Sequence, residues 1–96
     1  MKDQFTKKGL VHVGRGTYWV GFNMPGTITI APDRIQVRCW GKTYVFARDE
    51  IHQIRRFRAL ATLVQIVHKK PGYPRFIAFW TPMLGTVWSA LQRYGY

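Results

Sequence analysis

The chain has 96 residues, the size of one small domain, and 47% of them are hydrophobic while 20% are charged. This balance excludes a disordered chain and favours a globular one. Fifteen Lys and Arg residues face four Asp and Glu residues, which gives a formal net charge of +11. Internal salt bridges cannot neutralise such an excess. We therefore expect an anionic partner, namely nucleic acid, anionic lipid or an acidic protein surface, with a plainly solvated basic surface as the alternative.

Cys39 is the single cysteine, which excludes a disulfide within the chain. It alternates with polar residues on the apolar face of a predicted strand, so we expect a small buried hydrophobic residue. This cysteine usage is typical of a cytoplasmic protein, peripheral at the inner face of the membrane if it meets lipid. The segment MKDQFTKKG has no apolar core of a signal peptide, and no apolar run is long enough to span a bilayer.

Residues 1–16 are predicted to form an N-terminal arm or covering segment, and residues 17–96 the β-domain. The first eight residues are polar and mostly charged, which favours a loose arm. The next eight contain three glycines around apolar residues, and either a short strand or a covering loop fits them. Residues 18–24 are nearly all apolar and predict the first strand, followed by a turn at Pro25-Gly26.

Alternation with a period of two predicts the next strands, at residues 27–31 and 34–40. Pro32-Asp33 and Gly41-Lys42 have the residue types of the connecting turns. Ile51 and Ile54 lie three positions apart, which leaves the register of the strand near them open. The later strands are predicted at residues 43–47, 51–57, 61–68 and 76–80.

The hydrophobic period changes after residue 81 and predicts a helix at about residues 82–94. Thr81 is a good N-cap, Pro82 suits the first helical position, and Gly95 lies where a C-terminal cap glycine is expected. The helix is predicted to have one apolar face, and that face must cover another apolar surface, such as the open end of a small barrel or sandwich. The residues at helical spacing are Leu84, Val87, Trp88, Leu91 and Tyr94.

The order of these elements resembles the pleckstrin-homology-like (PH-like) superfold, most of all its compact bacterial members, over residues 18–96. The matching pieces are GTITIAPDRIQVR, RDEIHQI, VQIVHKKPGYPRFIAFW and the final LQRYGY. The resemblance implies a mainly β fold, a seven-stranded antiparallel PH-like barrel or sandwich capped by one C-terminal α-helix. Similar domains bind inositol phospholipids, peptides or other proteins, or serve as oligomerisation modules, and bacterial relatives often accompany membrane proteins.

One departure from the family pattern concerns phosphoinositide binding. Family members that bind these lipids typically carry a basic cluster in the loop between the first two strands. The corresponding loop here, residues 23–26, has no basic residue, and the earlier sequence GRGT offers only Arg15. The resemblance therefore does not extend to the standard phosphoinositide site.

Catalytic and metal-binding patterns are absent from the sequence. Asp33 and Asp49 have the sequence context of turns, and Asp49 and Glu50 are neighbours, whose side chains point apart in an extended chain. A paired general acid and base is thus not expected. The histidines lie on separate segments without a close-spaced ligand partner, so we expect no metal, no cofactor and no enzymatic activity.

Seven residues are predicted to bind the ligand. Arg34, Arg38 and Trp40 are expected on the outward face of the 34–40 strand, with Lys42 in the next turn. An exposed tryptophan beside arginines suits a nucleic-acid platform and equally a membrane interface, whereas packing of Trp40 under the arm or another chain is the alternative. The strand near residue 55 contributes Arg55, Arg56 and Arg58.

Two functions follow from these patterns. The first is a non-enzymatic interaction module that docks on an anionic membrane surface or a protein partner. The alternative is a small basic β-barrel protein that binds nucleic acid. The terminal helix speaks against the alternative, because five-stranded oligonucleotide-binding barrels usually have fewer strands before the chain ends. The sequence leaves the oligomeric state open.

Overall fold

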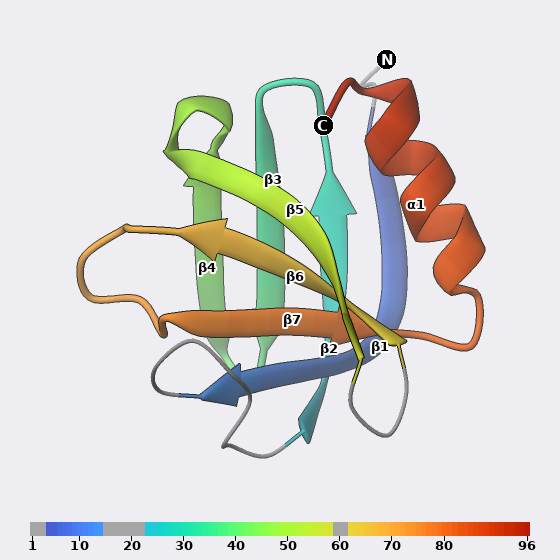
Figure 1. The fold of residues 1–96 in the computed structure, drawn as a ribbon. Coiled ribbons are helices and arrows are strands. Elements are labelled where there is room, and N and C mark those ends of the chain that lie inside the picture. Colours follow the sequence, from blue (N-terminus) through green and yellow to red (C-terminus); the bar gives the residue numbers. More distant parts are fainter. Residues whose placement is uncertain (1–3, 15–22, 59–61) are drawn as a thin grey trace.

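The computed structural model describes residues 4–14, 23–58 and 62–96, without the side chains of residues 23, 57 and 58. In these ranges seven antiparallel strands form one curled, half-barrel sheet in the order β4-β3-β2-β1-β7-β6-β5, followed by one helix, α1 (Leu84–Arg93) (Figure 1). The mainly β prediction, with seven antiparallel strands and a C-terminal helix, is confirmed. The strands are β1 (Phe5–Gly14), β2 (Asn23–Ile30), β3 (Arg34–Cys39), β4 (Lys42–Ala47), β5 (Ile51–Arg58), β6 (Thr62–His68) and β7 (Phe76–Trp80).

β1 is the middle strand of the sheet, although the sequence predicted an arm or covering segment there. Phe5–Gly14 pairs with β2 along most of its length, and its second half also pairs with β7. The loose arm predicted for the first eight residues is therefore wrong for residues 5–8. Of the two alternatives for residues 9–16, the strand is the one observed as far as Gly14. Its first half carries Lys and Thr side chains at exposed or half-buried positions, so its side chains do not show the apolar pattern of a central strand. Its backbone hydrogen bonds to β2 on one side and β7 on the other hold it in the sheet instead.

β2 begins at Asn23 and runs through Pro25-Gly26, where a turn was predicted. The predicted first strand at residues 18–24 lies outside the described residues as far as residue 22. Gly26 pairs with Gly9 of β1 and with Cys39 of β3. A Cβ atom at either glycine would collide with a backbone carbonyl of the neighbouring strand. Both glycines are therefore needed for the close backbone approach that curls the sheet, and not for a turn.

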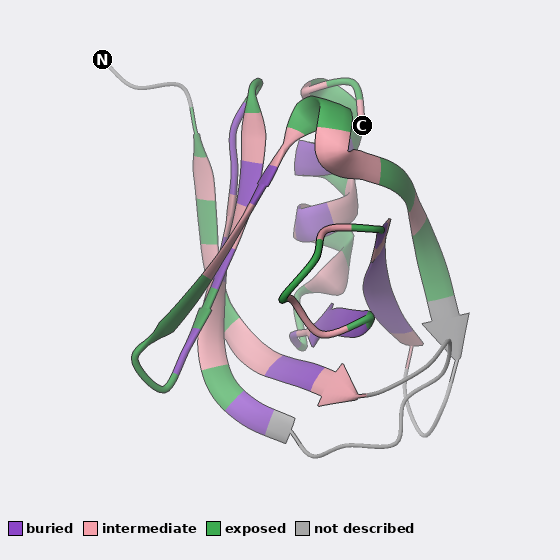
Figure 2. Ribbon diagram, turned by 90° about the vertical axis from the view of Figure 1, so that its left-hand side faces the viewer, coloured by how far each residue is buried: buried purple, intermediate pink, exposed green. Residues whose placement is uncertain are grey.

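The main core fills the concave side of the sheet. It includes Ile28, Ile35 and Phe46 of the strands, none of which is measurably exposed. α1 covers this side with Val87 and Leu91, so the predicted packing of the helix onto the sheet is observed (Figure 2). Cys39 is buried in the same core, as predicted from its alternation.

The ends of α1 differ in how well the sequence predicted them. The helix begins at Leu84, and the N-cap position is Met83, so Thr81 is not the N-cap residue. Gly95 has a φ angle of +80°, as expected for a C-terminal cap glycine. The Tyr96 N–H donates to the Leu91 carbonyl at 2.8 Å and the Gly95 N–H to the Gln92 carbonyl at 3.0 Å. These two bonds form a Schellman motif.

The register of β5 contains a β-bulge between Ile51 and Gln53. His52 is the extra residue, which explains why Ile51 and Ile54 lie three positions apart and are both half-buried against the core. After the bulge, Ile54 pairs with Ile66 and Arg55 pairs with Gln65 of β6. The side chain of Arg55 therefore lies on the convex side of the sheet, and the side chain of Arg56 lies on the concave side with Ile54.

Candidate functional site

The predicted ligand residues of β3 and β4 do not share one surface. Arg34 and Arg38 both lie on the convex face of β3, with the buried Ile35 and Val37 on the other face. Lys42 pairs with the buried Cys39, so it belongs to the opposite face of the hairpin. The expected grouping of the two arginines is thus present, and Lys42 does not join it.

Trp40 lies in the turn after β3 and not on the strand face where it was predicted. β3 ends at Cys39, and the two turn residues Trp40 and Gly41 have φ angles of +46° and +75°. This left-handed pair is the geometry of a tight hairpin turn, and it is an uncommon conformation for a bulky residue. The Trp40 side chain is 73% exposed at the tip of the β3–β4 hairpin. In this chain it is therefore not packed under another described segment.

The arginines of β5 lie on different faces of the sheet. The Arg56 guanidinium lies over the Trp88 ring of α1, 5.1 Å from its centroid, and covers the edge of the core there. Arg55 lies on the convex face opposite Gln65. Arg58 ends the strand, and its side chain is outside the described part of the chain. Of the two arginines whose side chains are described, Arg55 lines the basic groove and Arg56 does not.

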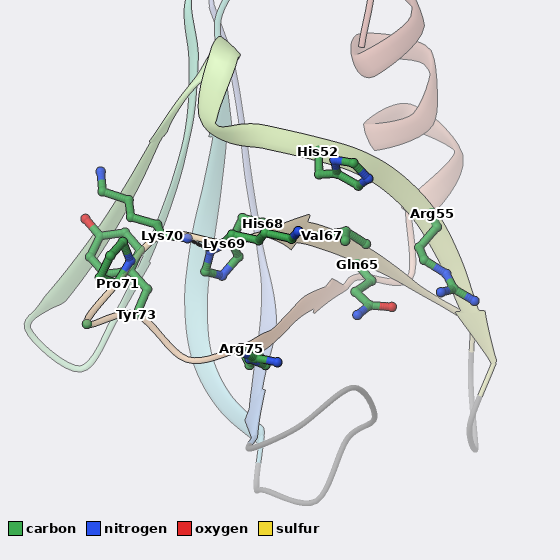
Figure 3. Close-up of a pocket in the computed structure, with 11 residues that line it drawn as sticks. His52, Arg55, Gln65, Val67, His68, Lys69, Lys70, Pro71, Tyr73 and Arg75 are labelled. Carbon is green, nitrogen blue, oxygen red and sulfur yellow. Dashed lines mark hydrogen bonds between the residues drawn. The ribbon is translucent and has the colours of Figure 1, made fainter.

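A groove of about 610 Å³ lies on the convex side of β5 and β6 and continues along residues 69–75, the loop before β7. In Figure 3, Arg55 and Tyr73 mark its two ends, with Gln65 and Arg75 between them. No described residue that lines it carries a carboxylate. The lining residues are His52, Arg55, Gln65, Val67, His68, Lys69, Lys70, Pro71, Gly72, Tyr73 and Arg75.

His68 holds the loop in place with both of its ring nitrogens. The Lys70 backbone N–H donates to Nδ1 at 2.9 Å, so Nδ1 is an acceptor and carries no proton. The proton is then on Nε2, which donates to the Pro74 carbonyl at 2.9 Å. Burial lowers the pKa of His68, against the opposing effect of the bond to Pro74. The neutral ring is therefore the form that this loop conformation requires.

Lys70 and Tyr73 connect the loop to the exposed edge of β4. The Lys70 ammonium donates to the Val45 carbonyl at 2.8 Å, and the Val45 N–H donates to the Tyr73 hydroxyl at 3.1 Å. These contacts satisfy backbone groups that an edge strand otherwise leaves open. Lys70 also pairs with Glu50 at 3.1 Å, and this hydrogen bond is the main reason that the pKa of Lys70 is raised. Lys70 is therefore a structural residue whose charge is neutralised locally.

Arg55, Lys69 and Arg75 are the cationic residues of the groove left for a ligand. No ion pair or hydrogen bond joins their side chains to another described residue. Lys69 and Arg75 flank the loop at the end of β6 and the start of β7, so the fold of the loop brings them toward β5. The sequence did not predict that these two residues share a groove with Arg55.

Gln65 is a groove residue that sequence reasoning did not identify. It is 5% exposed, and its side-chain oxygen Oε1 is buried with no hydrogen-bond partner in residues 4–14, 23–58 and 62–96. The available signal was a polar residue inside the otherwise apolar stretch LVQIV. Buried polar atoms normally find a partner, so an unpartnered one in the wall of a groove marks a position for ligand contact.

The described residues contain no group of three or more His, Cys, Asp or Glu residues that could hold a metal ion. No helix in the described ranges is long and apolar enough to cross a membrane. The groove's lining, with the guanidinium groups of Arg55 and Arg75, the Lys69 ammonium and the buried Gln65 amide, can bind an anion. Comparisons of the chain with models of protein families, with curated proteins and with solved structures find no match.

Proposed function

We propose that this protein is a non-enzymatic interaction module, similar to the PH-like superfold in the order of its elements, that docks on an anionic membrane surface. The groove on β5, β6 and the 69–75 loop takes lipid phosphates, and the cytoplasmic face of the membrane is the expected location. The observation that supports this proposal best is the set of three cations, Arg55, Lys69 and Arg75, in a groove whose described lining has no carboxylate. Each such residue near an anionic surface contributes about 1 kcal/mol to attachment.

The aromatic residues favour a membrane over nucleic acid. Binding of single strands uses free aromatic faces on which bases stack. The Tyr73 ring at the groove is already in contact with the rings of Tyr44 and Phe46 and with the Lys70 ammonium. The exposed Trp40 lies at a hairpin tip next to Lys42 and does not line the groove, so it offers no stacking face there, and its position suits the headgroup region of a bilayer.

Vesicle flotation tests this proposal. Vesicles of phosphatidylcholine alone are compared with vesicles that contain an anionic lipid, at low and high salt. The wild-type chain is expected to float only with anionic vesicles, and less as salt rises, because screening weakens contacts of exposed charges. A double variant, Arg55→Ser with Arg75→Ser, is expected to lose at least about tenfold in affinity, from two contacts of about 1 kcal/mol each.

The matched control removes the same charge from β3, which is distant from β5 in the strand order, with Arg34→Ser and Arg38→Ser. This control is expected to keep most of the binding. If the control loses binding and the groove variant keeps it, the β3 arginines carry the contact instead. A gel-shift assay with DNA and RNA in parallel would favour the nucleic-acid alternative if it shows binding that anionic vesicles do not.

A further inference from the structure

We infer that the groove selects an anionic group that also carries a free hydroxyl, the phosphate ester of a small polyol, and that Gln65 reads the hydroxyl. This inference rests on the proposed function, because it names the headgroup that the same groove takes. It starts from Gln65, whose side chain is 5% exposed and whose Oε1 atom has no hydrogen-bond partner among the described residues.

The amide oxygen of Gln65 can only accept a hydrogen bond. A ligand that satisfies it must therefore bring a donor into the groove. Arg55, Lys69 and Arg75 can only donate, so the same ligand must also bring acceptor oxygens, most favourably charged ones. An ammonium group on the ligand would be repelled by these three cations. Among the donors of phospholipid headgroups, a hydroxyl is then the one that remains, and a phosphate is the acceptor that matches the paired N–H groups of a guanidinium.

The register of the sheet places the cation of Arg55 beside the hydrogen-bond acceptor of Gln65. Arg55 pairs directly with Gln65 across β5 and β6, so their Cβ atoms are about 5 Å apart. In Figure 3 both side chains project in the same direction from the two strands. A phosphate and a hydroxyl that are two or three carbon atoms apart, as in a glycerol phosphate group, span a separation of this size. The groove volume of about 610 Å³ accommodates such a group.

The test compares an anionic lipid whose headgroup carries hydroxyls with an anionic lipid whose headgroup carries none. Phosphatidylglycerol and phosphatidylethanol carry the same phosphodiester charge, but the ethyl group has no hydroxyl. The wild-type chain is expected to bind phosphatidylglycerol vesicles about fivefold more tightly, in line with one hydrogen bond to a buried acceptor. Gln65→Met, which keeps the size of the side chain without the acceptor, is expected to abolish this preference and leave phosphatidylethanol binding within about twofold.

A matched variant and a melting curve separate recognition from folding. Gln53→Met makes the same chemical change at an exposed position of β5 and is expected to keep the preference. Gln65→Met is expected to melt at or above the wild-type temperature, because it removes an unsatisfied buried acceptor. A position that is unfavourable for stability and required for lipid preference would support a binding role. Loss of the preference in the Gln53 variant as well would contradict it.

The outcomes distinguish this inference from the proposed function. Equal binding of both lipids by the wild-type chain overturns the role of Gln65 and leaves membrane docking intact. Binding to neither lipid overturns membrane docking. In that case, calorimetry with soluble glycerol 3-phosphate and ethyl phosphate decides about the groove itself. Preference for glycerol 3-phosphate supports a free polyol phosphate as the ligand, and absence of a preference overturns the inference too.

Discussion

Replacement of Arg48 with alanine is expected to detach the C-terminal end of α1 from the sheet. The Arg48 guanidinium donates to the carbonyls of Pro32, Tyr94 and Gly95 at 2.8, 2.9 and 2.7 Å. It also lies over the Tyr96 ring, 4.5 Å from the centroid. Two of these carbonyls follow the last turn of the helix, where the partial charge is negative. One side chain thus joins the β2–β3 turn, the 3₁₀ turn that follows β4 (Arg48–Glu50) and the end of the helix.

The magnitude follows from these contacts. Three hydrogen bonds at about 1 kcal/mol each and an exposed cation–π contact at about 0.5 kcal/mol give an upper value near 3.5 kcal/mol. Arg48 is exposed, so water replaces part of this when the side chain is removed. We therefore expect a loss of about 2 kcal/mol, or roughly 10 °C in melting temperature for a domain of this size. Arg48→Lys keeps the charge but not the planar set of guanidinium N–H donors, and is expected to lose about half as much free energy of unfolding.

Thermal melts followed by circular dichroism measure this loss. Arg93→Ala is the control, because Arg93 is also a cation in the last turn of α1, and its guanidinium lies 5.3 Å from the Tyr94 ring centroid. It is expected to change stability by less than about 0.5 kcal/mol, as most exposed substitutions do. If Arg48→Ala melts within about 2 °C of the wild type, or if Arg93→Ala is equally destabilising, specific bonding by Arg48 is not what holds the helix end.

Three further predictions concern the fold. Leu91→Ala is expected to lower the free energy of unfolding by about 2–5 kcal/mol, because Leu91 is 1% exposed on the buried face of α1. An unchanged midpoint of urea unfolding would contradict this packing. Gly26→Ala is expected to destabilise by at least about 1–3 kcal/mol because its Cβ would meet a backbone carbonyl of β3, whereas Gly85→Ala, where a Cβ meets open space, should be neutral or stabilising. Burial lowers the pKa of both His12 and His68, so below about pH 6.5 the unfolded chain binds more protons than the folded chain. The stability that these histidines contribute should be complete above that pH and should decline as the pH falls toward their folded pKa values. A urea midpoint that stays constant from about pH 7.5 to 5 would refute this.

Local periodicity was sufficient for most of the elements. The alternation predicted strands at residues 34–40 and 43–47, and β3 and β4 occupy Arg34–Cys39 and Lys42–Ala47. The change of period after residue 81 predicted α1, and the glycine at position 95 predicted its end. These features are encoded locally, because each depends on which side chains of a short segment face the core.

The position of each strand in the sheet was decided only by tertiary pairing. The first half of β1 is polar, so its sequence resembles an arm, and its place in the middle of the sheet depends on backbone bonds to β2 and β7. Gly26 looked like a turn residue because sequence cannot distinguish a glycine that bends the chain from one that admits a neighbouring strand.

The candidate site depended on tertiary structure in the same way. The bulge at His52 sets which of Arg55 and Arg56 lies on the convex face, and a single-residue shift would exchange them. His68 and Lys70 fold the 69–75 loop beside β5 and β6, which brings cations from separate segments into one groove. From the sequence alone, the chain's basic charge and its strand faces could be predicted. The selection of particular cations required long-range contacts, because charges distant in sequence meet only through the pairing of the strands that carry them.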